Sequence, residues 1–270
     1  LRRLKGKYGA TLEDVIGFAD RARAELEALQ TLEERRCFLQ EKRRHLEEEA
    51  GRLAEDLSTA RQKLARGLTD LVNGELADLG MPWAKFDVGV RQEERPDGLP
   101  TSRGRYSTGQ FGIDRVEFLG ATNPGEPLRP LAEIASGGET CRFMLAVKTA
   151  LRQADSVPTL VFDEIDMGVG GRNAHTVGRK LASLARDRQV ICITHLPQIA
   201  CYGQDHYRVR KEVSSGRAAT RIERLEGSSR VEELAAMLGS YTDGAMLESA
   251  QDLLTRANDK ETDRATADVG

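Results

Sequence analysis

The sequence predicts an α/β domain that carries a long α-helical arm on its N-terminal side. All eight prolines among the 270 residues lie at or after Pro82, so no proline interrupts a helix before that point. The same early region repeats apolar residues at heptad spacing. After Pro130 the chain instead alternates helical patterns with short apolar runs. This alternation is typical of an α/β sheet that is parallel in part.

The arm is predicted as one helix from about Thr11 to Asn73. Residues 21–66 carry 11 basic and 10 acidic side chains, which indicates a solvated helix surface and not a basic DNA track. The apolar positions step by four and three, as in a coiled-coil seam: Leu46, Ala50, Leu53, Leu57, Ala60, Leu64, Gly67 and Leu71. Such a seam needs a second helix. No other stretch of this chain matches its length, so the partner is expected in another copy or elsewhere in the same polypeptide.

The start of the arm carries a turn followed by a helix cap. Gly6–Thr11 is turn-like, and Thr11 with Asp14 three residues later is typical of an N-cap. A chain reversal just before a long helix favours an antiparallel coiled-coil hairpin whose first arm lies upstream. Because the chain begins with Leu1, we expect it to be an internal or C-terminal part of a longer protein.

The remainder of the chain is predicted as a head lobe of strands and helices. Alternating apolar residues predict strands over 83–90 and 111–119, with a polar loop between them. The order that follows is helix (138–152), buried strand (159–163), helix (173–188), buried strand (189–194), two short strands (207–211 and 219–225) and two helices. The predicted domains are an arm (1–75), a head lobe (76–258) and a flexible tail (259–270).

Composition excludes several classes of protein. No run approaches the roughly 18 apolar residues of a membrane span. The four cysteines lack CxxC spacing, which disfavours a disulfide framework and predicts a reducing, cytoplasmic location. A zinc site at Cys192, His195, Cys201 and His206 is disfavoured because the first two lie on or at the end of a buried strand. The net charge of −3 neither favours nor excludes nucleic acid.

The first candidate for chemistry is a small-residue turn that opens an amphipathic helix. Ser136, Gly137 and Gly138 would expose backbone N–H groups and a hydroxyl at the positive end of the helix dipole, with Glu139 following. This arrangement suits a phosphate. Taken alone, Ser-Gly-Gly before a helix is more often an ordinary turn and helix cap.

Two further candidates lie at the ends of the apolar strands. Asp163 and Glu164 follow the first strand, where open α/β sheets bind ligands, so Asp163 could hold a magnesium and Glu164 could polarise a water. The alternative is that both carboxylates cap the next helix. His195 ends the second strand, where a lone histidine is more often structural. The order and spacing of all three features favour a functional series.

This series resembles the C-terminal half of an ABC-type ATPase head, with a signature motif, a Walker B strand with catalytic glutamate, a D-loop and a switch histidine. The stretches Thr122–Glu139, Phe162–Gly171 and Thr194–Ala200 are similar to the RecN family of bacterial DNA repair proteins, relatives of SMC and Rad50 proteins. The resemblance covers nearly the whole chain, because this family also has a coiled-coil arm. Thr140–Cys141 and Met167 depart from the usual Leu-Ser and Thr.

The resemblance implies a C-terminal head lobe of ABC/SMC type preceded by a long antiparallel coiled-coil arm, with ATP sandwiched between two heads. The signature, which would meet the γ-phosphate held by the opposite subunit, is implied to consist of Ser136, Gly137, Gly138 and Glu139. The resemblance also implies that Asp163 holds Mg²⁺ through water and that Glu164 orients the attacking water. His195 would sense the γ-phosphate, and Asp166 would couple the two sites across the interface.

No GxxxxGK[ST] motif occurs in the chain, so Walker A is expected in a separate N-terminal half and the chain is expected to be inactive alone. The resemblance further implies a homodimer through ATP-engaged heads, a role in DNA double-strand break repair and recombination, and a cytoplasmic, nucleoid-associated location. DNA binding is also implied. The residues indicate it only through basic patches at 1–7 and 205–224.

Two alternatives remain open. In the first, the chain is a head fragment of another Rad50- or SMC-type chromosome ATPase. In the second, it is a non-catalytic coiled-coil scaffold whose motifs serve only to stabilise the fold of the domain. A transporter subunit is disfavoured because transporters do not insert a heptad rod of this length at this position.

Overall fold

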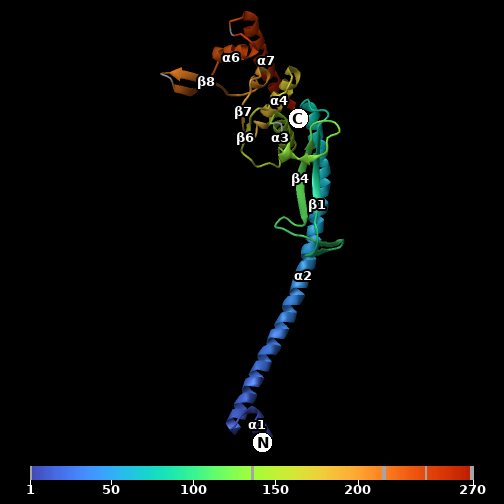
Figure 1. The fold of residues 1–270 in the computed structure, drawn as a ribbon. Helices are drawn as coiled ribbons and strands as arrows, with labels where there is room; N and C mark the ends of the chain where they lie inside the picture. The colour runs from blue at the N-terminus through green and yellow to red at the C-terminus, as the bar shows by residue number, and fades with distance from the viewer. Residues whose placement is uncertain (1, 135–136, 215–216, 241, 268–270) are drawn as a thin grey trace. The chain divides into compact units, whose positions relative to one another are not determined.

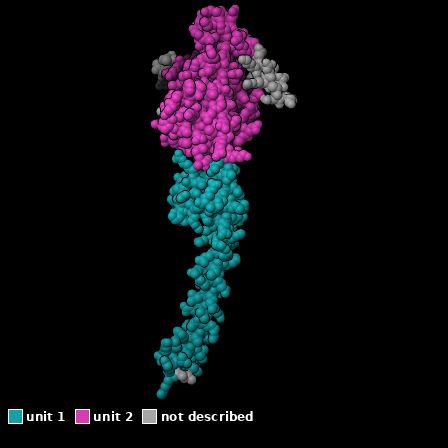
Figure 2. Space-filling model, turned by 90° about the vertical axis from the view of Figure 1, so that its right-hand side faces the viewer, with its two compact units in different colours: residues 1–62, 91–115 teal, residues 63–90, 116–270 magenta. Residues whose placement is uncertain are grey.

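The computed structural model describes residues 2–134, 137–214, 217–240 and 242–267, without the side chains of 213, 214, 217 and 259–267. Its contacts divide the chain into two compact units (Figure 2). The first unit comprises residues 1–62 and 91–115, and the second comprises 63–90 and 116–270. The predicted domain boundary at residue 75 therefore does not coincide with this division, because the segment 63–75 groups with the head and 91–115 groups with the arm.

The arm begins with α1 (Arg2–Tyr8) and continues as the 67-residue helix α2 (Leu12–Asp78) (Figure 1). The predicted N-cap is confirmed as a reciprocal capping box. The amide of Thr11 donates to Asp14 Oδ2 at 2.9 Å, and the amide of Asp14 donates to Thr11 Oγ1 at 3.1 Å. The turn needs glycine, since Gly9 has φ +154° and a Cβ there would lie 2.2 Å from Asp14 Cβ.

In the first unit, α2 buries a stripe of small residues and not the leucine seam. Gly51, Ala54 and Ser58 are buried, and a Cβ on Gly51 would lie 1.9 Å from the carbonyl oxygen of Pro100. Pro100 belongs to β2 (Glu94–Thr101), which pairs with β3 (Gly104–Tyr106) in an antiparallel hairpin. The prediction of a polar loop between the first two strands was therefore wrong in this part. Two prolines are tolerated because β2 is an edge strand.

A buried carboxylate fastens the hairpin segment to the helix. Asp114 accepts hydrogen bonds from Ser58 Oγ at 2.8 Å, Gln92 Nε2 at 3.0 Å and Arg61 Nη1 at 3.1 Å. Its side chain is completely shielded from solvent. Three donors compensate the cost of removing a carboxylate from water, and this cluster orders the first unit around α2.

The leucine seam of α2 remains open to solvent. Its large side chains are between 42% and 72% exposed: Leu46, Leu53, Leu57, Leu64 and Leu71. A surface helix normally buries its leucines, because each buried one contributes roughly 2 kcal/mol. The helix therefore has two stripes, one buried within the chain and one apolar stripe that the described residues do not cover.

In the second unit, the end of α2 joins the main core. Helix α2 ends at Asp78, five residues past its predicted end. Val72, Leu76 and Leu79 around this end are fully buried. They pack with Phe86 of β1 (Lys85–Gln92) and Phe143 of α3 (Gly137–Ala150). β1 belongs to a three-stranded sheet of order β1-β4-β5, with β4 at Asp114–Ala121 and β5 at Arg129–Pro130. The short helix η1 (Leu131–Glu133) follows β5.

A separate two-stranded parallel sheet lies at the centre of the predicted chemistry. β6 (Thr159–Phe162) pairs with β7 (Gln189–Cys192), with Val161 opposite Ile191. Between them runs α4 (Gly171–Leu184), so the predicted helix–strand–helix–strand order is confirmed. One face of the sheet enters the core through Leu160 and Phe162. The other face is exposed.

The C-terminal elements form a second, smaller core around Cys201, Leu234 and Ala250. They are α5 (Pro197–Ala200), the antiparallel hairpin of β8 (His206–Ser214) and β9 (Arg217–Leu225), α6 (Ser228–Leu238) and α7 (Gly244–Ala267). Helix α7 continues into the segment predicted as a tail, whose last three residues lie outside the description. Among the described residues, no helix has the length and hydrophobicity to cross a membrane.

Candidate functional site

The three predicted motif segments meet around the loop that follows β6. Asp163 and Glu164 stand exposed at the carboxyl end of this strand. The signature helix α3 begins in contact with this loop. His195, which follows β7, contacts Asp166 of the same loop. Ser136 lies outside the described residues, so the site is built here from the remaining seven predicted side chains and glycines.

Two glycines allow α3 to start in contact with this loop. A Cβ on Gly137 would lie 3.0 Å from Glu164 Oε2. A Cβ on the buried Gly138 would lie 2.8 Å from Met167 Cβ and 3.1 Å from the carbonyl oxygen of Glu164. Any larger residue at position 138 must displace the loop. Glu139 lies half-buried in the first turn of α3, close enough to Arg142 to favour its charged form.

A buried arginine ties α3 to the same loop, and sequence reasoning missed it. Arg142 stands one turn after Gly138 on the same helix face. Its Nη1 donates to the carbonyl oxygens of Met167 at 2.7 Å and Ile165 at 3.3 Å. Burial lowers the pKa of Arg142 from its usual range, opposed by the nearby Glu139. The available signal was a cation in an otherwise apolar stretch of an amphipathic helix.

Glu164 adopts an unusual backbone conformation. Its φ of +59° is the only positive value for a residue other than glycine in the part of the chain that the structure describes. The left-handed region costs an L-residue about 1–2 kcal/mol. Strain of this kind collects at functional sites, where the surrounding contacts enforce it. Here the enforcing contacts are the packed start of α3 and the two carbonyls held by Arg142.

The end of β7 is attached to the loop through a buried aspartate. Asp166 Oδ2 accepts hydrogen bonds from Thr194 Oγ1 at 2.6 Å and the amide of His195 at 2.8 Å, and lies 3.0 Å from His195 Nδ1. The Asp166 side chain is 2% exposed, whereas that of His195 is 72% exposed. The structure therefore gives Asp166 partners within its own chain, where the sequence led us to expect a contact across a head interface.

Burial raises the pKa of three of the four cysteine thiols. Cys141 Sγ lies 3.0 Å from the carbonyl oxygen of Asp163, and burial raises the pKa of its thiol. Burial also raises the pKa of Cys192 to about 12 and that of Cys201 to about 11. A raised pKa reduces the thiolate fraction at a given pH, and the thiolate is the reactive species.

We expect iodoacetamide at pH 8 to modify Cys37, which is exposed on the arm, at least tenfold faster than Cys141, Cys192 or Cys201. Peptide mass spectrometry over a time course measures the four rates separately. The matched control is the chain in urea, where all four are accessible and should react at similar rates. Equal rates for Cys37 and Cys141 in the folded chain would contradict the burial described here.

Comparison with known proteins identifies the family that these features resemble. No protein-family model matches the chain. The chain is 40% identical over 254 residues to the DNA repair protein RecN of Deinococcus radiodurans, covering 94% of this chain and 43% of that protein. It is 34% identical over 266 residues to RecN of Bacillus subtilis, covering 97% of this chain and 46% of that protein. The chain matches the C-terminal half of RecN.

The fold agrees with this match. The crystal structure of an Smc head domain with a coiled coil and joint from Pyrococcus yayanosii superimposes with a TM-score of 0.52 and 16% identity, covering 92% of this chain and 39% of that one. The architecture is thus a lobe of an SMC-type head with a long helical arm. The chain spans less than half the length of the RecN proteins that it matches.

The resemblance to RecN implies a magnesium ion, and Asp163 is the residue whose chemistry and position fit it. The described residues contain no group of three or more His, Cys, Asp or Glu side chains that could hold a metal. Asp163 is an exposed carboxylate at the strand end. Magnesium usually keeps several waters and takes one or two carboxylates plus substrate phosphates. Asp163 fits that mode of binding as one carboxylate ligand.

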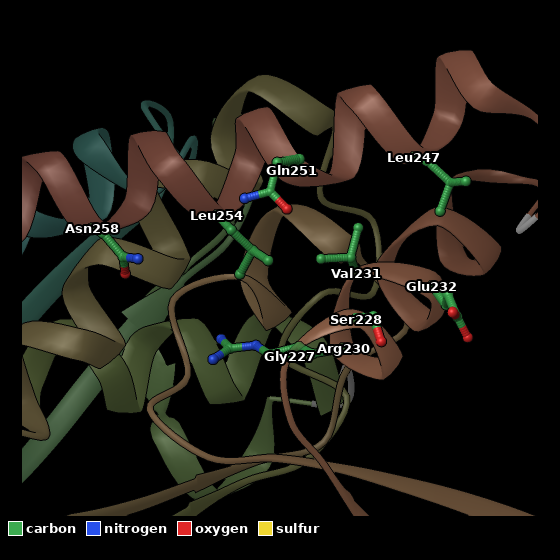
Figure 3. Close-up of a pocket in the computed structure, with 9 residues that line it drawn as sticks. All are labelled: Gly227, Ser228, Arg230, Val231, Glu232, Leu247, Gln251, Leu254 and Asn258. Carbon is green, nitrogen blue, oxygen red and sulfur yellow. The ribbon is translucent and has the colours of Figure 1, made fainter.

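A cavity of about 830 Å³ lies elsewhere, between α6 and α7 (Figure 3). Leu247, Gln251, Leu254 and Asn258 line it from α7, and Val231 lies opposite them on α6. Its lining contains none of the residues predicted from the resemblance to RecN. The motif chemistry and this cavity are therefore separate features of the second unit.

Two arginines of the basic patch on the β8–β9 hairpin form close ion pairs. Arg208 pairs with Glu223 at 2.7 Å and with Glu233 at 3.0 Å, and Arg224 pairs with Asp205 at 2.6 Å. Arg210 and Lys211 are exposed and lie on opposite faces of the hairpin, because strand side chains alternate.

Proposed function

We propose that this chain is the C-terminal lobe of an ATPase head that acts in DNA double-strand break repair and recombination. In this proposal two heads engage around ATP, hydrolysis releases them, and the assembly acts on DNA in the cytoplasm at the nucleoid. The observation that carries the proposal is the convergence of the signature start, the Asp163–Glu164 pair and His195 on one loop. The match to RecN supports the same reading.

Each residue has a role that its geometry suits. Asp163, exposed at the strand end, would bind a magnesium that neutralises charge on the phosphates. Glu164, held with φ +59° and its carboxylate exposed, would orient the attacking water. His195 would meet the γ-phosphate. Ser136, Gly137, Gly138 and Glu139 would form the signature surface presented to the nucleotide of the opposite head.

A second polypeptide segment is needed to complete the head, and two open apolar surfaces support this part of the proposal. Val161, Ile191 and Ile193 are 62%, 45% and 56% exposed on the uncovered face of the β6–β7 sheet. Parallel sheets are normally covered on both faces. We propose that the lobe carrying Walker A covers this face, and that a second helix of the arm pairs with the leucine seam of α2.

The test combines binding and turnover. The chain alone is expected to hydrolyse no ATP, and mixing with a separately produced upstream half of the same protein is expected to restore turnover. Replacing Val161 and Ile193 together by aspartate should weaken association of the halves at least 100-fold in calorimetry, because two charges would be buried in an apolar interface. Turnover should fall in parallel.

The matched control is Val209→Asp with Ile222→Asp, which places the same two charges on paired, exposed apolar positions of the β8–β9 hairpin (64% and 67% exposed). This variant should leave association and turnover unchanged. Normal association after the Val161/Ile193 change would contradict the docking surface. Association of the wild-type halves without any turnover would contradict the ATPase and favour a coiled-coil scaffold.

A further inference from the structure

We infer that Asp166 is a positioning residue for His195, which holds the imidazole with Nδ1–H directed inward and leaves Nε2 as the nitrogen presented to an anionic ligand. The inference rests on the proposed function only for the identity of that ligand, the γ-phosphate of a nucleotide. The orientation of the ring is a property of this chain alone.

The contacts that support it converge on one atom. Asp166 Oδ2 accepts hydrogen bonds from Thr194 Oγ1 and the amide of His195, and lies 3.0 Å from His195 Nδ1. Thr194 Oγ1 in turn accepts from the amide of Leu196 at 3.0 Å. The carboxylate is buried, and a buried charge persists only where donors compensate its lost hydration. Both donors and the ring belong to the two residues Thr194 and His195 that follow β7, so the carboxylate holds this turn and lies against the ring.

The aspartate is itself held on both sides. Its neighbour Ile165 is fully buried, and Arg142 binds the carbonyl oxygens of Ile165 and Met167, the residues that flank Asp166. The ring is therefore fixed by a group that has little freedom to move, which is the arrangement that orients histidines in metal sites and catalytic triads.

The tautomer follows from the chemistry of the acceptor. An ionised carboxylate only accepts hydrogen bonds, and an Nδ1 lone pair 3.0 Å from its oxygen would be repelled, so the hydrogen belongs on Nδ1. In the neutral ring Nε2 then bears the lone pair. Nε2 is then the ring nitrogen that faces away from Asp166 and is left to meet a phosphate oxygen, to which an Nε2–H of an imidazolium would donate.

The experiment is ¹⁵N NMR of the intact 270-residue chain labelled at histidine, at a pH above the titration of the rings. The chain has four histidines, and the His195 signals are assigned by their loss in His195→Gln. We expect a pyrrole-type shift at Nδ1 and a pyridine-type shift at Nε2, the reverse of the tautomer that free neutral histidine favours. The free-histidine pattern at His195 in the wild-type chain would overturn the inference.

Asp166→Asn should move His195 toward the Nε2–H tautomer, because the amide can donate to Nδ1. Thr194→Val is the matched control: it removes another bond to the same oxygen and should leave the tautomer unchanged. In the assembled head, Asp166→Asn should lower kcat about tenfold to 100-fold with little change in KM. His195 shifts that stay unchanged in Asp166→Asn would overturn the positioning role. The expected tautomer combined with full turnover of His195→Gln would support the positioning and overturn the proposed phosphate contact.

Discussion

Replacing Glu164 by glutamine is expected to lower ATP turnover of the assembled head by about 10²- to 10⁴-fold, the usual contribution of a positioned acid or base. Glutamine keeps the size of the side chain but loses the negative charge that would orient and activate water. ATP binding should persist, because Glu164 is not assigned to the phosphates. Steady-state turnover and nucleotide binding by the mixed halves measure the two effects separately.

The strained backbone at Glu164 supplies a matched control. Glu164→Gly also removes the carboxylate, yet it relieves the cost of φ +59°. Relief of about 1–2 kcal/mol is partly offset by the entropy of glycine in the unfolded chain. We therefore expect this variant to be equally inactive but as stable as the parent, or more stable by up to about 1 kcal/mol. A clear loss of stability would show that the side chain packs the loop, and full turnover in Glu164→Gln would eliminate the proposed role.

Replacing Arg142 by methionine is expected to lower the free energy of unfolding by about 2–4 kcal/mol. The change leaves the carbonyl oxygens of Ile165 and Met167 without their donor inside the protein, and each unsatisfied buried group costs about 1–3 kcal/mol. The effect should be local, with faster amide exchange in residues 164–167. Urea unfolding followed by circular dichroism gives the free energy, and hydrogen exchange gives the location.

The control for Arg142 is Arg66→Met, which removes an exposed arginine from α2. This change should alter stability by no more than about 0.5 kcal/mol. Arg142→Lys should recover part of the loss, because one ammonium can reach one of the two carbonyls. If Arg142→Met is as stable as the Arg66 control, the guanidinium does not hold the loop.

Several features were predictable because they depend on residues close together in sequence. The capping box of Thr11 and Asp14 involves groups three residues apart, and it formed as expected. The strands β6 and β7 also appeared near their predicted bounds, since each is a short apolar run between helices. The order of signature, carboxylate pair and histidine indicated the family before any geometry was known.

Other features were decided by contacts between distant parts of the chain. The heptad pattern identified the leucine seam of α2, yet the face that the chain itself buries is the stripe of Gly51, Ala54 and Ser58. Nothing in the local pattern distinguishes these small residues from ordinary surface positions. They are buried because β2 passes so close that only glycine fits opposite Pro100.

The same distinction applies to the candidate site. The sequence by itself determined which chemical groups stand at the strand ends and at the start of α3, because hydrophobic pattern and spacing specify the elements. Only the tertiary structure decided how these groups are paired. Asp166 contacts His195, which is 29 residues away in the sequence. Arg142 binds the carbonyl oxygen of Met167, which is 25 residues away. Hydrogen bonds of buried polar groups depend on which segments the fold brings together, and no local periodicity encodes that choice.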